Sequence, residues 1–149
     1  MKPRSKVLII AGSDSSGGAG IQADIKTVTA LGSYAMTAIT AVTCQNTKGV
    51  KAITSISAKN LEKQMSMVLD DIGSNAIKIG MLHNTNLIKC VHKVLKKYKI
   101  KNIVLDPVMI SKGGFRLISR NSVKYLKKLI LPLSDVITPN IPEAEVLTG

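Results

Sequence analysis

Aromatic residues are scarce in this sequence of 149 residues, which holds no Trp, one Phe and three Tyr. Since 45% of the residues are hydrophobic, the chain can bury a core, but that core must be aliphatic. Proteins that bind single-stranded nucleic acid without sequence preference stack the bases on aromatic side chains. The shortage of aromatic residues therefore argues against that class of protein.

Acidic residues are also few, because nine Asp and Glu stand against 21 Lys and Arg, for a formal net charge of +12. Such an excess attracts phosphates and raises the hypothesis of a nucleic-acid or membrane-surface partner. The densest run of lysines lies between residues 89 and 101, where Lys89, Lys93 and Lys97 recur at helical spacing. This spacing is typical of a solvated helix face, so we predict no nucleic-acid partner.

Only two cysteines occur, Cys44 and Cys90, and they stand far apart without the spacing of a disulfide framework or a metal site. No hydrophobic run approaches the about 18 residues that cross a bilayer. The basic start of the chain is not followed by a hydrophobic segment with a cleavage site. We therefore predict a cytoplasmic protein with reduced thiols and no membrane partner.

Strand-like runs alternate with amphipathic helical patterns along the chain. The run from Val7 to Ala11 is continuous and aliphatic, as expected of a strand buried on both faces of a parallel sheet. Further predicted strands are 34–43, 52–57, 76–79, 102–105 and 136–138, and predicted helices are 19–31, 61–72, 84–97 and 119–129. The alternation predicts a single α/β domain over residues 1–149, with a mostly parallel sheet flanked by helices on both faces.

Polar and small residues gather where the predicted strands end. In parallel sheets, ligands bind outside the carboxyl ends of the strands. The segments that follow such ends are 13–20, 44–46, 80–81, 106–114 and 140–143. The sequence therefore predicts one binding site on this rim of the sheet.

The glycine-rich loop after the first strand resembles part of a P-loop. Its first half, from Gly12 to Gly17, has the glycine spacing of that motif. However, Gly18 and Ala19 stand where a P-loop carries the Lys that binds phosphate and the Ser or Thr that binds Mg²⁺. The P-loop interpretation therefore fails.

The same loop also fits the dinucleotide fingerprint, with Gly18, Gly20 and Ala23 after a strand and at the start of a helix. A dinucleotide site needs a carboxylate about 20 residues further on for the ribose hydroxyls. Between Asp24 and Glu62 the chain has no acidic residue. An NAD-dependent oxidoreductase is therefore a weak alternative, and a structural turn of small residues remains open for the loop alone.

The second predicted strand ends in polar residues, among them Gln45. A glutamine side chain offers two N–H donors and one carbonyl acceptor. This pair of groups suits the edge of an aminopyrimidine or an amide better than the diol of a ribose.

Five blocks of the sequence resemble, in order and spacing, the hydroxymethylpyrimidine/phosphomethylpyrimidine kinases of the ribokinase-like superfamily. They are AGSDSSGGAGIQADIKT, TAVTCQNTKGV, IKIGML, LDPVMISKGG and TPNIPEAEVLTG, so the resemblance extends from Val7 to Gly149. Members of this family transfer phosphate from ATP to 4-amino-5-hydroxymethyl-2-methylpyrimidine and then to its monophosphate, which supplies the pyrimidine half of thiamine. The resemblance implies a ribokinase-like fold and an ATP-dependent kinase that uses Mg²⁺.

The resemblance also implies that the glycine-rich loop binds the substrate. Gln45 would hydrogen-bond the aminopyrimidine edge, while Met81 and Val108 would pack on the faces of the ring. The full set implied for the pyrimidine is Gly12, Ala19, Asp24, Gln45, Met81 and Val108. In this set the small residues would let the backbone close over the ring, and Asp24 would either contact the substrate or hold the loop.

A second group of residues is implied for the nucleotide. Asn140 and Glu143 form an Asn-x-x-Glu element that the resemblance links to Mg²⁺ and the phosphates through water, in keeping with the preference of Mg²⁺ for oxygen ligands and bound waters. The same element, with Pro142, also fits the start of a short helix. Asp106 and Lys112 are implied to approach the nucleotide or the transferring phosphate.

The family pattern places its catalytic base near a Gly-Thr-Gly segment, which does not occur in this sequence. We therefore expect no catalytic residue in this chain, a base beyond Gly149, and a fold whose C-terminal part is absent. An incomplete sheet leaves an edge unpaired, which favours association, so a homodimer is one expected arrangement. Two other hypotheses stay open, a non-catalytic remnant that keeps the pyrimidine pocket and a pyridoxal kinase.

Overall fold

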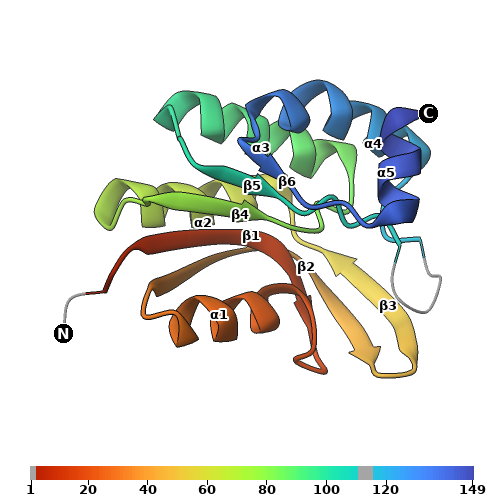
Figure 1. Ribbon diagram of the computed structural model, residues 1–149, viewed down its shortest axis with the longest axis horizontal. Coiled ribbons are helices and arrows are strands. Elements are labelled where there is room, and N and C mark those ends of the chain that lie inside the picture. The colour runs from red at the N-terminus through yellow and green to blue at the C-terminus, as the bar shows by residue number, and fades with distance from the viewer. Residues whose placement is uncertain (1–2, 111–115) are drawn as a thin grey trace.

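The computed structural model describes residues 3–110 and 116–149, and its strands and helices alternate as the sequence predicts (Figure 1). The strands are β1 (Lys6–Asp14), β2 (Tyr34–Asn46), β3 (Gly49–Ser55), β4 (Ala76–Ile79), β5 (Ile103–Leu105) and β6 (Val136–Ile137). The helices are α1 (Gly20–Ala30), α2 (Ala58–Asp71), α3 (Thr85–Tyr98), α4 (Arg120–Tyr125) and α5 (Ile141–Thr148).

The six strands form one sheet in the order β3-β2-β1-β4-β5-β6. All neighbouring strands pair in parallel except β2 and β3, which form an antiparallel hairpin. The carboxyl ends of β1, β2, β4, β5 and β6 therefore meet at one rim of the sheet.

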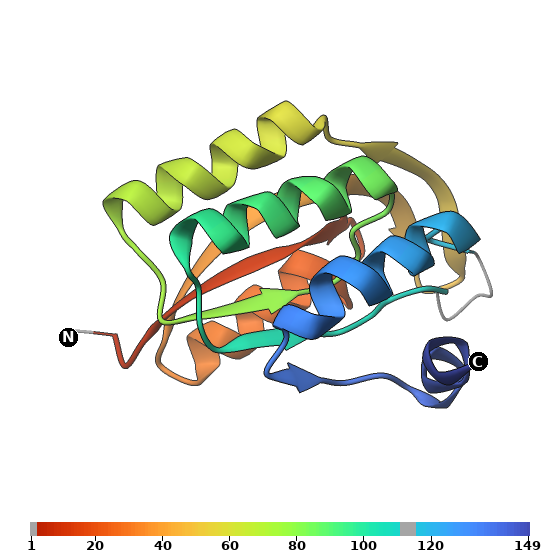
Figure 2. The same cartoon turned by 90° about the horizontal axis from the view of Figure 1, so that it is seen from above.

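Helices cover both faces of this sheet (Figure 2). On one face Ile21 of α1 packs against Ile9 and Ala11 of β1. On the other face α2, α3 and α4 lie over a larger cluster that includes the fully buried Leu61 and Ile88. The predicted fold class, a mostly parallel α/β sheet between helices, is confirmed. The largest fully buried side chains of the described residues are Leu, Ile and Met, as the composition predicts.

The central strands are longer than the hydrophobic pattern predicts. β1 continues to Asp14 and β2 to Asn46, so Ser13 and Gln45 lie in strands and not in loops. The hairpin turns at Thr47 and Lys48, and β3 spans Gly49–Ser55 instead of 52–57. The strands continue through polar residues here, and the hydrophobic pattern of the sequence cannot predict strand residues that are polar.

The helix predicted over 119–129 is present, with Ser119 as its N-cap, but its second half is not a regular α-helix. α4 ends at Tyr125, and the chain continues as a π-helical turn (Leu126–Ile130) and a 3₁₀ turn (Leu131–Leu133). Pro132 has no N–H to donate, so a regular α-helix cannot extend through it.

The lysine-rich helix α3 has the predicted division into two faces. Ile88 and Val91 are fully buried, whereas Lys89 and Lys93 are exposed. The Lys93 Nζ lies 2.8 Å from a carboxylate oxygen of Glu62 on α2. Part of the lysine excess therefore forms a solvated helix face.

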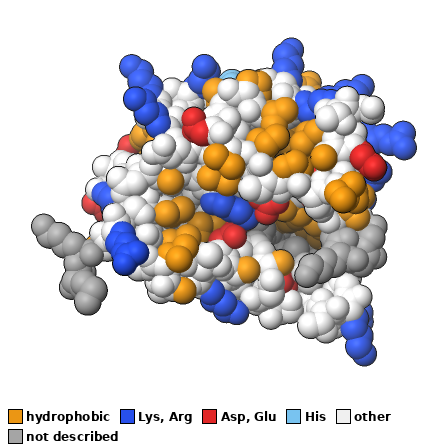
Figure 3. All heavy atoms as spheres, viewed as in Figure 1, with side chains coloured by type: hydrophobic (Ala, Val, Ile, Leu, Met, Phe, Trp, Pro, Cys, Tyr) orange, Lys and Arg blue, Asp and Glu red, His pale blue; other side chains and the backbone are white. Residues whose placement is uncertain are grey.

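The sheet has β3 and β6 as its two edges among the described residues. Val136 and Ile137 of β6 and Ile141 of α5 are exposed, and Figure 3 shows hydrophobic side chains at the surface among scattered lysines and arginines. An unpaired edge beside such side chains favours association. The homodimer stays a prediction.

In the described part of the chain, no helix is long and hydrophobic enough to cross a membrane.

Candidate functional site

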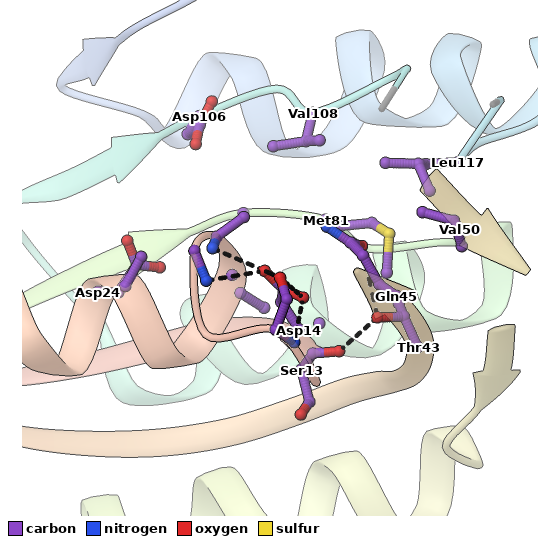
Figure 4. Close-up of a pocket in the computed structure, with 18 of the residues that line it drawn as sticks. Ser13, Asp14, Asp24, Thr43, Gln45, Val50, Met81, Asp106, Val108 and Leu117 are labelled. Atoms are coloured by element: carbon purple, nitrogen blue, oxygen red, sulfur yellow. Dashed lines mark hydrogen bonds between the residues drawn. The ribbon is translucent and has the colours of Figure 1, made fainter. Parts of the chain in front are cut away.

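A cavity of about 800 Å³ opens at the rim of the sheet (Figure 4). Nine of the ten residues predicted for the site line it: Gly12, Ala19, Asp24, Gln45, Met81, Asp106, Val108, Asn140 and Glu143. The tenth, Lys112, lies outside the described residues. The predicted substrate and nucleotide residues therefore share one cavity.

A buried carboxylate holds the glycine-rich loop in shape. Asp14, the last residue of β1, accepts hydrogen bonds from the backbone N–H groups of Ser16, Gly18 and Ala19 at 2.8 to 3.0 Å, and from the Ser16 hydroxyl. Burial raises the pKa of the Asp14 carboxyl, but the hydrogen bonds outweigh burial and hold that pKa below its usual value. The negative charge also lies at the N-terminus of α1, where it stabilises the helix.

The backbone donors of residues 16–19 are therefore all used within the loop. Three of them bind the Asp14 carboxylate, and the fourth, the N–H of Gly17, donates to the Asp14 carbonyl oxygen at 3.0 Å. In P-loop and dinucleotide sites, such N–H groups bind phosphate instead. This arrangement agrees with the sequence argument against an NAD site.

Two glycines permit close approaches at this rim, one between the start of α1 and β1 and one between β1 and Met81. Gly20 has φ +55°, and a Cβ at this position would overlap the carbonyl oxygen of Gly12. A Cβ at Gly12 would come within 2.5 Å of the Met81 Cε. Sequence reasoning selected Gly12 and missed the stricter requirement at Gly20, which only the close approach of α1 to β1 reveals.

Gln45 is held by residues of the first strand and its loop. The Ser15 hydroxyl donates to the Gln45 carbonyl oxygen at 2.7 Å and accepts from the Gln45 N–H at 2.9 Å. The Thr43 hydroxyl donates to the Ser13 carbonyl oxygen at 2.9 Å and lies 3.4 Å from the Gln45 Oε1. Figure 4 shows the Gln45 side chain beside Thr43 and Met81.

Hydrophobic side chains form the walls near Gln45. Met81 is buried and packs in one cluster with Ala41 and Leu117, against which Val108 also packs. Sequence reasoning predicted Met81 and Val108 but missed Leu117, because that residue does not follow a strand end. The walls and the glutamine amide together suit a flat ring with polar atoms on one edge.

Away from Gln45, the cavity carries an ion-pair network. The Nζ of Lys78 lies 2.9 Å from the Asp24 carboxylate and 3.2 Å from the Asp106 carboxylate. Lys78 is on β4, Asp24 on α1, and Asp106 just after β5. Of the two roles considered for Asp24, this geometry favours the structural one. Lys78 was missed, although a lysine inside the short predicted strand 76–79 was a signal for it.

Asn140 and Glu143 form a capping box at the start of α5. The Asn140 Oδ1 accepts from the Glu143 N–H at 2.9 Å, and the Glu143 Oε2 accepts from the Asn140 N–H at 3.0 Å. The buried Glu143 also accepts from the Met109 N–H at 3.3 Å. The helix-start interpretation is thus confirmed, and it leaves each carboxylate oxygen with a further lone pair.

The fit of this element to Mg²⁺ is indirect. Within residues 3–110 and 116–149 there is no group of three or more His, Cys, Asp or Glu side chains that could hold a metal ion. Mg²⁺ keeps several waters and is often bound through one carboxylate together with substrate phosphates. Glu143 fits such a water-mediated contact, and the described residues do not form a closed metal cage.

Comparison with known proteins decides the family, because residues 14–149 match the family described as phosphomethylpyrimidine kinase. The chain belongs to this family. The hydroxymethylpyrimidine/phosphomethylpyrimidine kinase of Haemophilus influenzae is 54% identical over 144 residues, which cover 97% of this chain and 54% of that protein. The predicted resemblance is confirmed.

Solved structures of the phosphomethylpyrimidine kinase family and of related kinases share the fold. A crystal structure of phosphomethylpyrimidine kinase from Clostridium difficile has a TM-score of 0.91 and 52% identity, covering 97% of this chain and 62% of that one. An ADP complex of Bacillus subtilis pyridoxal kinase has a TM-score of 0.86 and 40% identity, covering 97% and 55%. The ribokinase-like fold is therefore confirmed, and the chain spans about half the length of the curated kinases it matches.

Proposed function

We propose that this chain forms the pyrimidine-binding part of an ATP-dependent kinase of thiamine biosynthesis. Its substrates are 4-amino-5-hydroxymethyl-2-methylpyrimidine and the corresponding monophosphate. The observation that carries the proposal is the shared cavity, in which Gln45 and Glu143 both lie although they come from distant parts of the chain. Membership of the phosphomethylpyrimidine kinase family supports this substrate class.

In this proposal the ring lies at the hydrophobic end of the cavity. The Gln45 amide pairs with the amino group and the adjacent ring nitrogen, because an amide offers a donor and an acceptor side by side. Met81 and Val108 contact the ring, and Gly12 and Ala19 leave room for it. Asp14 fixes the loop and leaves its backbone donors unavailable to phosphate.

The nucleotide lies in the same cavity, beside Asn140 and Glu143, in this proposal. Mg²⁺ and ATP are the proposed co-substrates, with Asn140 and Glu143 contacting the metal through water and Asp106 near the phosphates. When bound, Mg²⁺ neutralises phosphate charge during transfer. Since the sequence contains no Gly-Thr-Gly segment, these residues have the role of ligand binding, and none of them is assigned the role of catalytic base. The cytoplasmic location stays a prediction.

Pyridoxal kinase is the second candidate, favoured by the 40% identity to the Bacillus subtilis pyridoxal kinase. A pyridoxal ring and an aminopyrimidine have similar size but different polar edges. Competition between the two ligands for this chain separates the candidates, and we expect the aminopyrimidine to displace pyridoxal.

Isothermal titration of the full chain with 4-amino-5-hydroxymethyl-2-methylpyrimidine tests the proposal. We expect saturable binding that weakens about tenfold or more in Gln45→Ala, because a ring edge then loses its paired partner. Asn86→Ala, on the exposed surface of α3, is the matched control and should bind normally. Absence of binding at millimolar ligand, or equal affinity in Gln45→Ala, contradicts the proposal. An ADP-release assay with Mg²⁺ and ATP then separates an active kinase from a binding module.

A further inference from the structure

The Ser15 hydroxyl makes hydrogen bonds to the Gln45 backbone that a neighbouring strand would otherwise make. The ladder between β1 and β2 ends with the pair Asp14 and Thr43, before it reaches Gln45. The Ser15 Oγ continues this ladder by donating to the Gln45 carbonyl oxygen at 2.7 Å and accepting from its N–H at 2.9 Å. Both distances are those of good hydrogen bonds. One side-chain oxygen thus replaces a backbone N–H and a backbone C=O.

Ser15 is also the first residue of the loop that Asp14 organises. The next residues, 16, 18 and 19, donate their N–H groups to the Asp14 carboxylate. Ser15 therefore stands between this hydrogen-bonded loop and the backbone of Gln45. A displacement of the loop must break or move the two hydrogen bonds to Gln45.

We propose that Ser15 is a positioning residue for Gln45, so that the conformation of the glycine-rich loop and the recognition of the ring are coupled. Ser15 fixes the backbone from which the Gln45 side chain enters the cavity. The effect on ligand binding rests on the proposed function, whereas the effect on the Gln45 backbone concerns the protein alone.

The exposure of Ser15 makes this role separable from a role in folding. Ser15 is exposed, so Ser15→Ala buries no unpaired group at position 15 and leaves no cavity. The Gln45 N–H, in contrast, loses its acceptor. A local effect at Gln45 with an unchanged core is therefore the expected signature of positioning.

Amide hydrogen exchange, followed by NMR on the ligand-free full chain, tests whether Ser15 fixes the Gln45 backbone. We expect the Gln45 N–H to exchange about tenfold faster in Ser15→Ala, because its hydrogen bond is lost. Ser15→Thr keeps the hydroxyl and should retain slow exchange. The N–H groups of Leu8 and Ile10 in the buried part of β1 are the internal control and should not change. Equal exchange of the Gln45 N–H in wild type and Ser15→Ala overturns the inference.

A double-mutant cycle of Ser15 and Gln45 tests whether Ser15 affects ring binding through Gln45. Binding is measured by NMR titration, because this method also detects weak complexes. We expect Ser15→Ala to weaken binding of 4-amino-5-hydroxymethyl-2-methylpyrimidine about threefold to tenfold in the wild-type background and to have no further effect in Gln45→Ala. An equal loss in both backgrounds overturns the positioning role.

The two measurements keep the inference and the proposed function apart. If exchange at Gln45 depends on Ser15 but the wild type binds no pyrimidine, the proposed function fails and the tie between Ser15 and Gln45 stands. If the wild type binds the pyrimidine but the Gln45 N–H exchanges equally fast in wild type and Ser15→Ala, only the positioning role of Ser15 fails.

Discussion

The ammonium group of Lys78 lies 2.9 Å from a carboxylate oxygen of Asp24, across the interface between the sheet and α1. The same ammonium lies 3.2 Å from the Asp106 carboxylate at the end of β5. One cation thus connects the helix that follows the glycine-rich loop to the segment that carries Val108. These three side chains are only 21 to 33% exposed, so water screens them incompletely.

Lys78→Met should leave two neighbouring carboxylates without their cation. We expect the free energy of unfolding to fall by about 1–2 kcal/mol, because removal of one partner from a partly buried network leaves uncompensated charge. Urea unfolding measures this change. Lys93→Met breaks the more exposed pair with Glu62 and should cost less than about 0.5 kcal/mol. Equal costs for the two substitutions contradict the role assigned to Lys78.

Gly20→Ala should be strongly destabilising. The added Cβ meets the Gly12 carbonyl oxygen, and φ is +55°, a region that favours glycine. We expect a loss of about 2 kcal/mol or more in thermal or urea unfolding. Gly18→Ala is the matched control, because the nearest atoms to its Cβ lie 3.9 Å away, and it should change stability by less than about 0.5 kcal/mol. Equal tolerance at the two positions shows that the loop has another conformation.

Asp14→Asn should weaken the loop and change its response to acid. An amide nitrogen cannot accept the hydrogen bonds that the Asp14 Oδ2 receives from Gly18 and Ala19, so we expect a loss of about 1–2 kcal/mol at neutral pH. Because the folded-state pKa of Asp14 is lowered, its contribution is fully present above the pKa of the unfolded chain and is lost as the pH falls through the lower folded-state pKa.

Urea unfolding between about pH 6 and pH 3 measures this linkage. Wild type should lose stability more steeply than Asp14→Asn at the acid end of the range. Asp71→Asn, at an exposed position at the end of α2, is the control and should follow the wild-type slope. Parallel curves for wild type and Asp14→Asn would show that the Asp14 carboxylate does not stabilise the folded loop.

Much of the fold could be predicted because its signals are local. The hydrophobic spacing of α3 separates Ile88 and Val91 from Lys89 and Lys93, and this division needs no knowledge of the rest of the chain. The convergence of the rim segments followed from the parallel sheet alone.

Other features depend on contacts between distant residues and could not be predicted. The tie between Ser15 and Gln45 forms only because the first two strands are neighbours in register. The network of Lys78 needs the position of β4 next to both β1 and β5. For Asn140 and Glu143 the sequence left two interpretations open, and the hydrogen bonds confirm the capping box while the contact with Mg²⁺ stays a proposal.

In the proposed function, side chains from separate segments of the chain form one site for an aminopyrimidine. Chemical-shift mapping by NMR examines this site residue by residue, with 4-amino-5-hydroxymethyl-2-methylpyrimidine added to the isotope-labelled chain. We predict perturbed amide signals at Gly12, Gln45 and Met81, and unperturbed signals at Asn84 and Asn86 at the start of α3. No perturbation at Gln45, or perturbations centred on the start of α3, would show that the aminopyrimidine does not bind in this cavity.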